Sequence, residues 1–210
     1  MRVIVSLFAL AISASASSQD LPLGFGIASP THLSADRPLY LYSSADGHPS
    51  TATPLDSLTV SEGPHHAELA TAPPWLDPEA VRLDYDLLTF RVIALRRYWV
   101  EVVVHTRDVR WPPRTMWLDR EAVRFVPWAA YLLEIHSIET SEAAPVFASP
   151  ADPTPPIGWT TAERRLHVLE VRHTWARVAL ADATEAEAGP LGWVRWHDGE
   201  HLLVQPSILH

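Results

Sequence analysis

The chain has 210 residues, 47% of them hydrophobic and 20% charged, which is typical of a packed globular protein rather than a disordered one. A formal net charge of −9 disfavours nucleic acid as a partner, because phosphate binding requires clustered positive charge. The absence of cysteine excludes disulfides, thiolate metal sites and a lipoprotein acyl anchor.

The first residues are typical of an export signal. Arg2 supplies a positive charge, residues 3–12 are apolar but too few to span a bilayer, and residues 14–16 are small enough for a cleavage site. We therefore expect residues 1–16 to be a signal peptide and the mature chain to begin near Ser17. No later run approaches the length of a membrane span, so the sequence predicts a soluble periplasmic or secreted protein.

Short strand-like runs follow, separated by residues typical of turns. They are rich in β-branched and aromatic residues or alternate in polarity, and the 19 prolines and 8 glycines lie mostly between apolar runs. In the first half of the chain the predicted strands are residues 25–27, 38–42, 87–94, 98–104, 116–119 and 123–126.

The same pattern recurs in the second half. Trp99 and Trp175 are 76 positions apart (175 − 99), as are Trp117 and Trp193 (193 − 117). A shared offset across two tryptophans and the valines around them indicates a tandem repeat of one small β unit. The second copy runs from Leu166 to Val194, with Trp175 and the residues up to Leu180 in one of its strands. Other strands of this half are expected at residues 129–139, 144–148, 192–195 and 202–205.

The first copy is longer than the second by roughly 30 residues, which fall within 53–86. This insertion contains His65, His66 and Trp75, and Pro78 is placed to begin one helical turn. A loop of this length inside a compact domain is either functional or a lid over exposed core. A hydrolase site within it is one alternative to a non-enzymatic function.

Alternation assigns the faces of the tryptophan-bearing strands. In residues 98–104 the valines point inward, which places Trp99 outward, and the same pattern places Trp117, Trp175 and Trp193 outward beside charged residues. Aromatic side chains in that setting favour a recognition surface, with a Trp–Trp pair across each hairpin. In the alternative, the four pack between the units or beneath the insertion, because such an exposed surface promotes aggregation.

The loop at residues 105–115 is a second candidate for ligand contact. It contains Arg110, Trp111 and Arg114, whereas the corresponding loop of the second copy, residues 181–190, is acidic. Arginine side chains bind carboxylates through two parallel hydrogen bonds. The alternative is an ordinary solvated loop with Trp111 packed against its own sheet.

Residues 168–180 (VLEVRHTWARVAL), followed by Gly192, Trp193 and Val194, resemble bacterial SH3-like (SH3b) domains. The first copy departs from the pattern at Met116, where the family usually has glycine, and by its insertion. The resemblance implies an all-β protein with two small, partly open β-barrels near residues 24–128 and 130–207. Such domains accompany exported bacterial proteins and bind cell-wall peptides or other proteins, and the resemblance implies no catalytic residue.

Catalysis, metal binding and cofactor binding each require a characteristic residue pattern. The pairs His167 with His173 and His197 with His201 have spacings found in metal sites, but no predicted helix places them on one face. The sequence has no Gly-x-Ser-x-Gly motif, separated acid pair or glycine-rich phosphate loop. We expect no metal, no cofactor and no enzymatic activity.

The sequence therefore predicts an exported, non-enzymatic module that binds a cell-wall peptide, peptidoglycan or an envelope protein. The alternative is a structural or inhibitory subunit that docks through the surface of the tandem barrels. The candidate ligand-binding residues are Trp111, Arg110, Arg114, Trp99, Trp117, Trp175 and Trp193.

Overall fold

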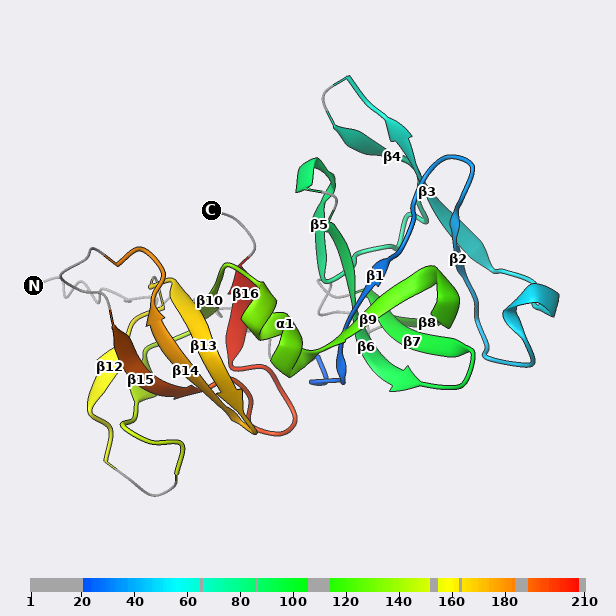
Figure 1. Cartoon of the computed structure of the whole chain (residues 1–210). Helices are drawn as coiled ribbons and strands as arrows, with labels where there is room; N and C mark the ends of the chain where they lie inside the picture. The colour runs from blue at the N-terminus through cyan, green and yellow to red at the C-terminus, as the bar shows by residue number, and fades with distance from the viewer. Residues whose placement is uncertain are drawn as a thin grey trace, which may run out of the picture.

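The structure is a computed structural model, and it describes residues 21–64, 66–85, 87–105, 114–151, 155–162, 164–183 and 189–207. These residues form several β-sheets and one α-helix, which confirms the predicted all-β fold (Figure 1). No helix in these ranges is long and apolar enough to cross a membrane. The predicted signal peptide, residues 1–16, lies outside them.

The N-terminal unit is built on one sheet with strand order β8-β7-β6-β1-β9, and β5 also pairs with β6. Its strands are β1 (Gly26–Pro30), β5 (Ala80–Arg82), β6 (Leu87–Leu95), β7 (Trp99–His105), β8 (Arg114–Asp119) and β9 (Val123–Pro127). The valines that alternate along β7 pack with Phe90 of β6 in a buried core. The prediction that these valines point inward is therefore confirmed.

The C-terminal unit repeats this arrangement, with strand order β15-β14-β13-β10-β16. Its strands are β10 (Ser137–Thr140), β13 (Leu166–Arg172), β14 (Trp175–Leu180), β15 (Pro190–Arg195) and β16 (Val204–Ser207). The register repeats as well, since Trp99 lies opposite Asp119 and Trp175 lies opposite Arg195. The offset of 76 between the tryptophans thus corresponds to equivalent positions in two sheets.

A small ribbon of antiparallel strands lies beside each sheet. In the N-terminal unit it consists of β2 (Leu39–Leu41), β3 (Asp56–Glu62) and β4 (Ala67–Thr71), and in the C-terminal unit of β11 (Ala144–Val146) and β12 (Gly158–Thr160). A single bridge, Tyr42 to Trp117 or Phe147 to Trp193, ties each ribbon to the outermost strand of its sheet. We call these two structures the N-terminal ribbon and the C-terminal ribbon.

The inserted residues 53–86 add strands to the sheets, and Trp75, Leu76 and Val81 pack over the core. The helical turn expected at Pro78 does not form. The inserted residues lengthen β3, add β4 as a third ribbon strand and supply β5, followed by one 3-10 turn, η3 (Leu83–Tyr85). The segment after Pro78 is extended because Ala80 and Val81 pair with β6 and Val81 packs on the core. Tertiary pairing overrides the local preference for a helical turn.

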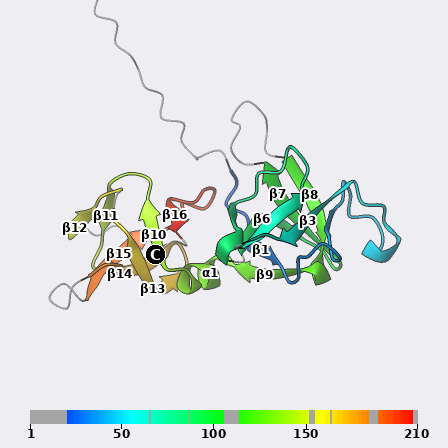
Figure 2. The same cartoon turned by 90° about the horizontal axis from the view of Figure 1, so that it is seen from above.

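The strand expected at residues 129–139 is wrong over most of its length. Residues Trp128–Glu134 form the helix α1, and β10 begins only at Ser137. Trp128, Tyr131 and Leu132 are buried on one face, the spacing of an amphipathic helix. In Figures 1 and 2 this helix lies between the two units, and its apolar face belongs to a core that also includes Ile27 of β1.

The chain makes a tight turn at residues 198–201, where the backbone N–H of Asp198 donates to the carbonyl of His201 at 3.2 Å. The loop is closed by a bridge between His197 and Leu202, and the next strand, β16, pairs with β10 rather than with β15. The carboxylate of Asp198 accepts backbone hydrogen bonds from Glu200 (2.8 Å) and His201 (2.7 Å). These bonds fix the turn, after which the chain continues as β16 at the far edge of the sheet.

Candidate functional site

The four paired tryptophans are buried, so the expectation that they form an outward recognition surface is wrong. Their exposed fractions are 2% for Trp99, 8% for Trp117, 5% for Trp175 and 6% for Trp193. They lie neither between the units nor beneath the insertion, as the alternative expected. They lie on the second face of their sheets, covered by the segment that follows β2 in the N-terminal unit and by Phe147, which follows β11, in the C-terminal unit.

The contacts of Trp99 show how the segment after β2 buries this face. Its ring meets the edge of the Tyr42 ring with centroids 4.9 Å apart, and its indole N–H donates to the carbonyl of Gly47 at 3.0 Å. Phe147 meets Trp175 in the same way, at 5.1 Å. Alternation along β7 places Trp99 on one face of the sheet and the valines on the other. Both faces are buried, the valine face by the core and the Trp99 face by the segment after β2.

Trp99 and Trp117 are diagonal neighbours rather than a directly opposed pair, because the register places Trp117 opposite Glu101. Trp117 is covered by the guanidinium of Arg96, 4.5 Å from the ring centroid, and Trp193 is covered by the equivalent Arg172 at 5.2 Å. The charged residues beside the tryptophans therefore serve as their packing partners.

The basic loop is only partly described. Arg110 and Trp111 lie outside the described residues, so their assignment as ligand contacts stays a prediction. Arg114, the first residue of β8, is exposed, and its guanidinium lies 4.2 Å from the ring centroid of Trp75. This stacking connects the loop to the inserted segment.

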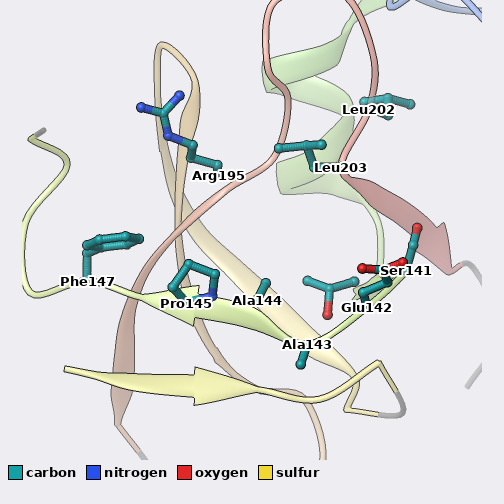
Figure 3. A pocket seen from close by; sticks show the side chains of 10 residues that line it. Ser141, Glu142, Ala143, Ala144, Pro145, Phe147, Arg195, Leu202 and Leu203 are labelled. Carbon is teal, nitrogen blue, oxygen red and sulfur yellow. The ribbon is translucent and has the colours of Figure 1, made fainter. Parts of the chain in front are cut away.

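A pocket of about 310 Å³ lies beside the C-terminal ribbon (Figure 3). Its apolar wall is formed by Pro145 of β11, the adjacent Phe147, and Leu202 and Leu203 from the loop before β16. Arg195, the last residue of β15, lines the same pocket. Strand β11 and the end of β15 are held together by the bridge between Phe147 and Trp193.

The polar groups of this pocket have opposite charges at separate places. Figure 3 shows Arg195 above Pro145, whereas Glu142 and Ser141 lie at the other end of the cavity. The guanidinium of Arg195 is 4.8 Å from the ring centroid of Trp175, which orients it by stacking. Thr140 also lines the pocket, and its hydroxyl is buried without a hydrogen-bond partner.

Such a pocket is suited to a ligand with an anionic group, an apolar part and a cationic group in sequence. Guanidinium groups bind carboxylates, and a carboxylate such as that of Glu142 binds an ammonium group. Apolar walls with a few placed polar groups are typical of ligand sites. A segment of peptide has all three features.

A second hollow, of about 510 Å³ and more open, lies where the units meet. It is lined by Leu23 and Phe25 of the N-terminal segment, Ile93 of β6 and His201 of the loop before β16. The backbone N–H of Leu23 donates to the carbonyl of Glu200 at 2.6 Å, so the two units are joined at this point.

A contact between a serine and a histidine, or a cluster of metal-ligating side chains, would indicate a catalytic or metal site. One contact between a serine and a histidine, Ser50 Oγ to His48 Nδ1 at 2.9 Å, belongs to the N-cap of the 3-10 turn η2 (Pro49–Thr51), where the same nitrogen also accepts the N–H of Ser50. No group of three or more metal-ligating side chains occurs in the described part of the chain. Neither observation identifies a catalytic centre.

No protein-family model and no curated protein matches the chain. Among solved structures, one similar chain is described as the structure of NlpC2 from Trichomonas vaginalis, with a TM-score of 0.32 and 8% sequence identity. The alignment covers 88% of this chain and 49% of that one, so the chain spans about half the length of this neighbour. A likeness this weak carries no argument about fold or function.

The pocket residues were missed because they lie where the two copies differ. In the repeat, Arg195 is equivalent to Asp119, and Phe147 is equivalent to Tyr42. The similarity between the two copies alone indicates a structural role for these positions. The signal in the sequence that could have identified the pocket is the change from the acidic Asp119 to the basic Arg195 at equivalent positions.

Proposed function

We propose that this protein is an exported, non-enzymatic binding module of two SH3-like units, and that its pocket beside β11 binds a short extended peptide. The ligand is a cell-wall peptide or a segment of an envelope protein. The observation that supports the proposal is the pocket itself, which presents Arg195 and Glu142 at separate ends of an apolar wall. Export is supported by the signal-like sequence of residues 1–16.

The charge of the pocket favours a peptide over a simple anion or an apolar molecule. An isolated anion can contact Arg195 but not Glu142, and an apolar molecule contacts neither charge. A peptide stem with a free amino group and a carboxylate satisfies both, with an alkyl side chain against Pro145 and Leu203. Specificity then comes from the distance between the two charges.

The test is retention of the purified protein on cell-wall sacculi, together with titration of soluble muropeptides by calorimetry. Arg195→Gln is expected to weaken binding about tenfold or more, since it removes a charge-assisted pair. Arg195→Lys should recover part of the loss. Arg172→Gln is the matched control, because Arg172 stacks on Trp193 in the same unit but does not line the pocket.

Two results contradict this proposal in different ways. If Trp111→Ala abolishes retention and Arg195→Gln does not, the site is the basic loop and not the pocket. If neither sacculi, muropeptides nor peptides from envelope proteins bind, the protein is not a peptide-binding module of this kind.

A further inference from the structure

β12 is an unprotected strand edge. Proteins protect the edge strands of their sheets with charged residues, prolines or covering segments, because unpaired backbone groups invite pairing with another chain. Among the terminal strands of the described sheets, most contain such a residue: Glu68 in β4, Arg82 in β5, Arg114 in β8, Pro127 in β9, Pro145 in β11, Pro190 in β15 and Pro206 in β16. β2 continues directly into Tyr42, which bridges to β8. β12, with the sequence Gly-Trp-Thr, has neither charge nor proline.

The backbone of Trp159 is directed toward this open edge. Trp159 lies opposite Pro145 in the antiparallel pair of β11 and β12. Because proline has no N–H, this pair does not exchange hydrogen bonds. In antiparallel sheets, the N–H and C=O groups of such a pair point away from the partner strand. Trp159 therefore presents one donor and one acceptor on the outer side of β12.

The side chains around this edge are apolar and exposed. Trp159 is 65% exposed and Ile157 is 60% exposed, the two highest values among the large hydrophobic residues of the described chain. Residues 157–162 are uncharged throughout. An exposed apolar group next to unpaired backbone is the combination that strand pairing buries.

The N-terminal ribbon shows the same edge in a protected form. Ile157 donates its N–H to Val146, and Leu55 donates equivalently to Leu41, both at 2.8 Å, so the two ribbons correspond. There β3 begins with Asp56, and from Thr59 onward β4 pairs with it as a third strand. The residues that correspond to β12 are Asp56, Ser57 and Leu58, where Asp56 supplies a charge, and β4 adds a strand to β3 only beyond them. Among the described sheets, β12 is thus the edge of this type that lacks such protection.

We propose that β12 is a self-association edge, on which a second copy of this chain adds its own β12 in antiparallel orientation. In this arrangement Trp159 lies opposite the partner's Trp159, and each N–H donates to the other's carbonyl oxygen. The two indole rings lie side by side on one face of a four-stranded sheet, β11-β12-β12-β11. The contact is two-fold symmetric and closes, so the product is a dimer and not a fibre.

The absence of charge along this edge permits a second copy here, and the small contact area limits the strength of the contact. Two chains of net charge −9 repel one another, and the uncharged run of residues 157–162 lets them approach without placing like charges in contact. A tryptophan side chain buries at most roughly 250 Å², so this edge falls well short of the roughly 1,000 Å² of a stable interface. The dimer is therefore weak and concentration-dependent.

The test is sedimentation equilibrium of the purified protein from micromolar to millimolar concentration. We expect a monomer–dimer equilibrium that Trp159→Arg weakens about tenfold or more, because it places a charge at the centre of the contact. Tyr40→Arg is the matched control, since Tyr40 is an exposed aromatic residue of the N-terminal ribbon. In hydrogen exchange, the Trp159 amide should become slower to exchange as protein concentration rises.

The proposal is overturned if the protein stays monomeric at millimolar concentration, or if Trp159→Arg, with an unchanged melting temperature, dimerises as the parent does. It is also overturned if only an added extended peptide from another protein slows exchange of the Trp159 amide, because the occupant is then not a second copy. Arg195→Gln, which tests the pocket, should leave the dimer unaffected.

Discussion

At the scale of single residues, Arg91 connects three segments that are far apart in sequence. Its guanidinium donates to both carboxylate oxygens of Glu79, at 2.9 and 2.6 Å, and to the carbonyl of Pro22 at 3.1 Å. It also lies 5.6 Å from the ring centroid of Trp128. The side chain of Arg91 is only 7% exposed, so these partners replace water almost completely. The ion pair holds β5 and the N-terminal segment against α1.

Arg91→Ala is expected to destabilise the fold by about 3 kcal/mol, because it leaves the largely buried carboxylate of Glu79 without its partner. The free energy of unfolding in urea measures this. The exposed pair of Arg124 and Glu134, at 2.8 Å, is the control, and Arg124→Ala should cost no more than about 1 kcal/mol. If the two variants lose the same free energy of unfolding, the burial of the Arg91–Glu79 ion pair does not make it more important for stability than the exposed pair.

Tyr131 on α1 makes stability depend on alkaline pH. Burial, together with the nearby carboxylates of Glu79 and Glu134, raises the pKa of Tyr131 from 10.0 to about 12. Its contribution to stability is therefore complete below pH 10 and is lost as the pH rises toward 12, at about 1.4 kcal/mol per pH unit. Tyr131→Phe should remove this slope from unfolding free energies measured across that range. An identical slope in the variant would contradict the assignment.

At the scale of elements, the equivalent hairpins β7–β8 and β14–β15 have their register shifts at different positions. In the C-terminal unit the register of β14 and β15 shifts directly after Val178 and Gly192, and Gly192 has a φ of +144°. In the N-terminal unit the equivalent pair, Val102 and Met116, is followed by a regular pair, and the shift comes later, after Val103. Met116 therefore replaces the glycine because the irregularity has moved along the hairpin.

Gly192→Ala is expected to destabilise the protein by at least about 1 kcal/mol, since φ is positive and the added carbon would lie 2.5 Å from the carbonyl oxygen of Phe147. Gly158→Ala meets no atom within 4 Å and should be neutral or slightly stabilising. Thermal unfolding of both variants makes the comparison. A neutral Gly192→Ala would show that the hairpin can shift its register in this unit too.

Strand positions could be predicted because the alternation of apolar and polar residues is local in the chain, and because the repeat offset of 76 residues can be read directly from the sequence. The helix α1 was missed although Trp128, Tyr131 and Leu132 have helical spacing, because its apolar residues were assigned to an expected strand. The burial of Trp99 was missed for a different reason. Alternation shows which residues share a face, but only the path of the chain after Tyr42 determines whether that face meets water. The pocket depends on the same long-range path.

At the scale of the whole molecule, the core of the C-terminal unit extends through α1 onto the N-terminal sheet, which also has a core of its own. The cluster that fills the C-terminal unit includes Ile27 and Val126 of the N-terminal sheet, with Trp128 between them. The N-terminal segment reinforces this junction, since the indole N–H of Trp128 donates to the carbonyl of Leu23 at 2.7 Å, and Leu23 in turn donates to Glu200. Units joined through a common core are expected to unfold together.

Calorimetry of the purified protein should therefore show one cooperative transition whose calorimetric and van't Hoff enthalpies agree. Trp128→Ala removes a side chain that is packed against both units and costs about 3–5 kcal/mol, which should separate the melting of the two sheets into two transitions. Leu133→Ala, on the exposed side of the same helix, should leave a single transition. Two transitions already in the parent protein would mean that the shared core around Trp128 does not couple the units, and the junction would then act only as a tether between two independently folding sheets.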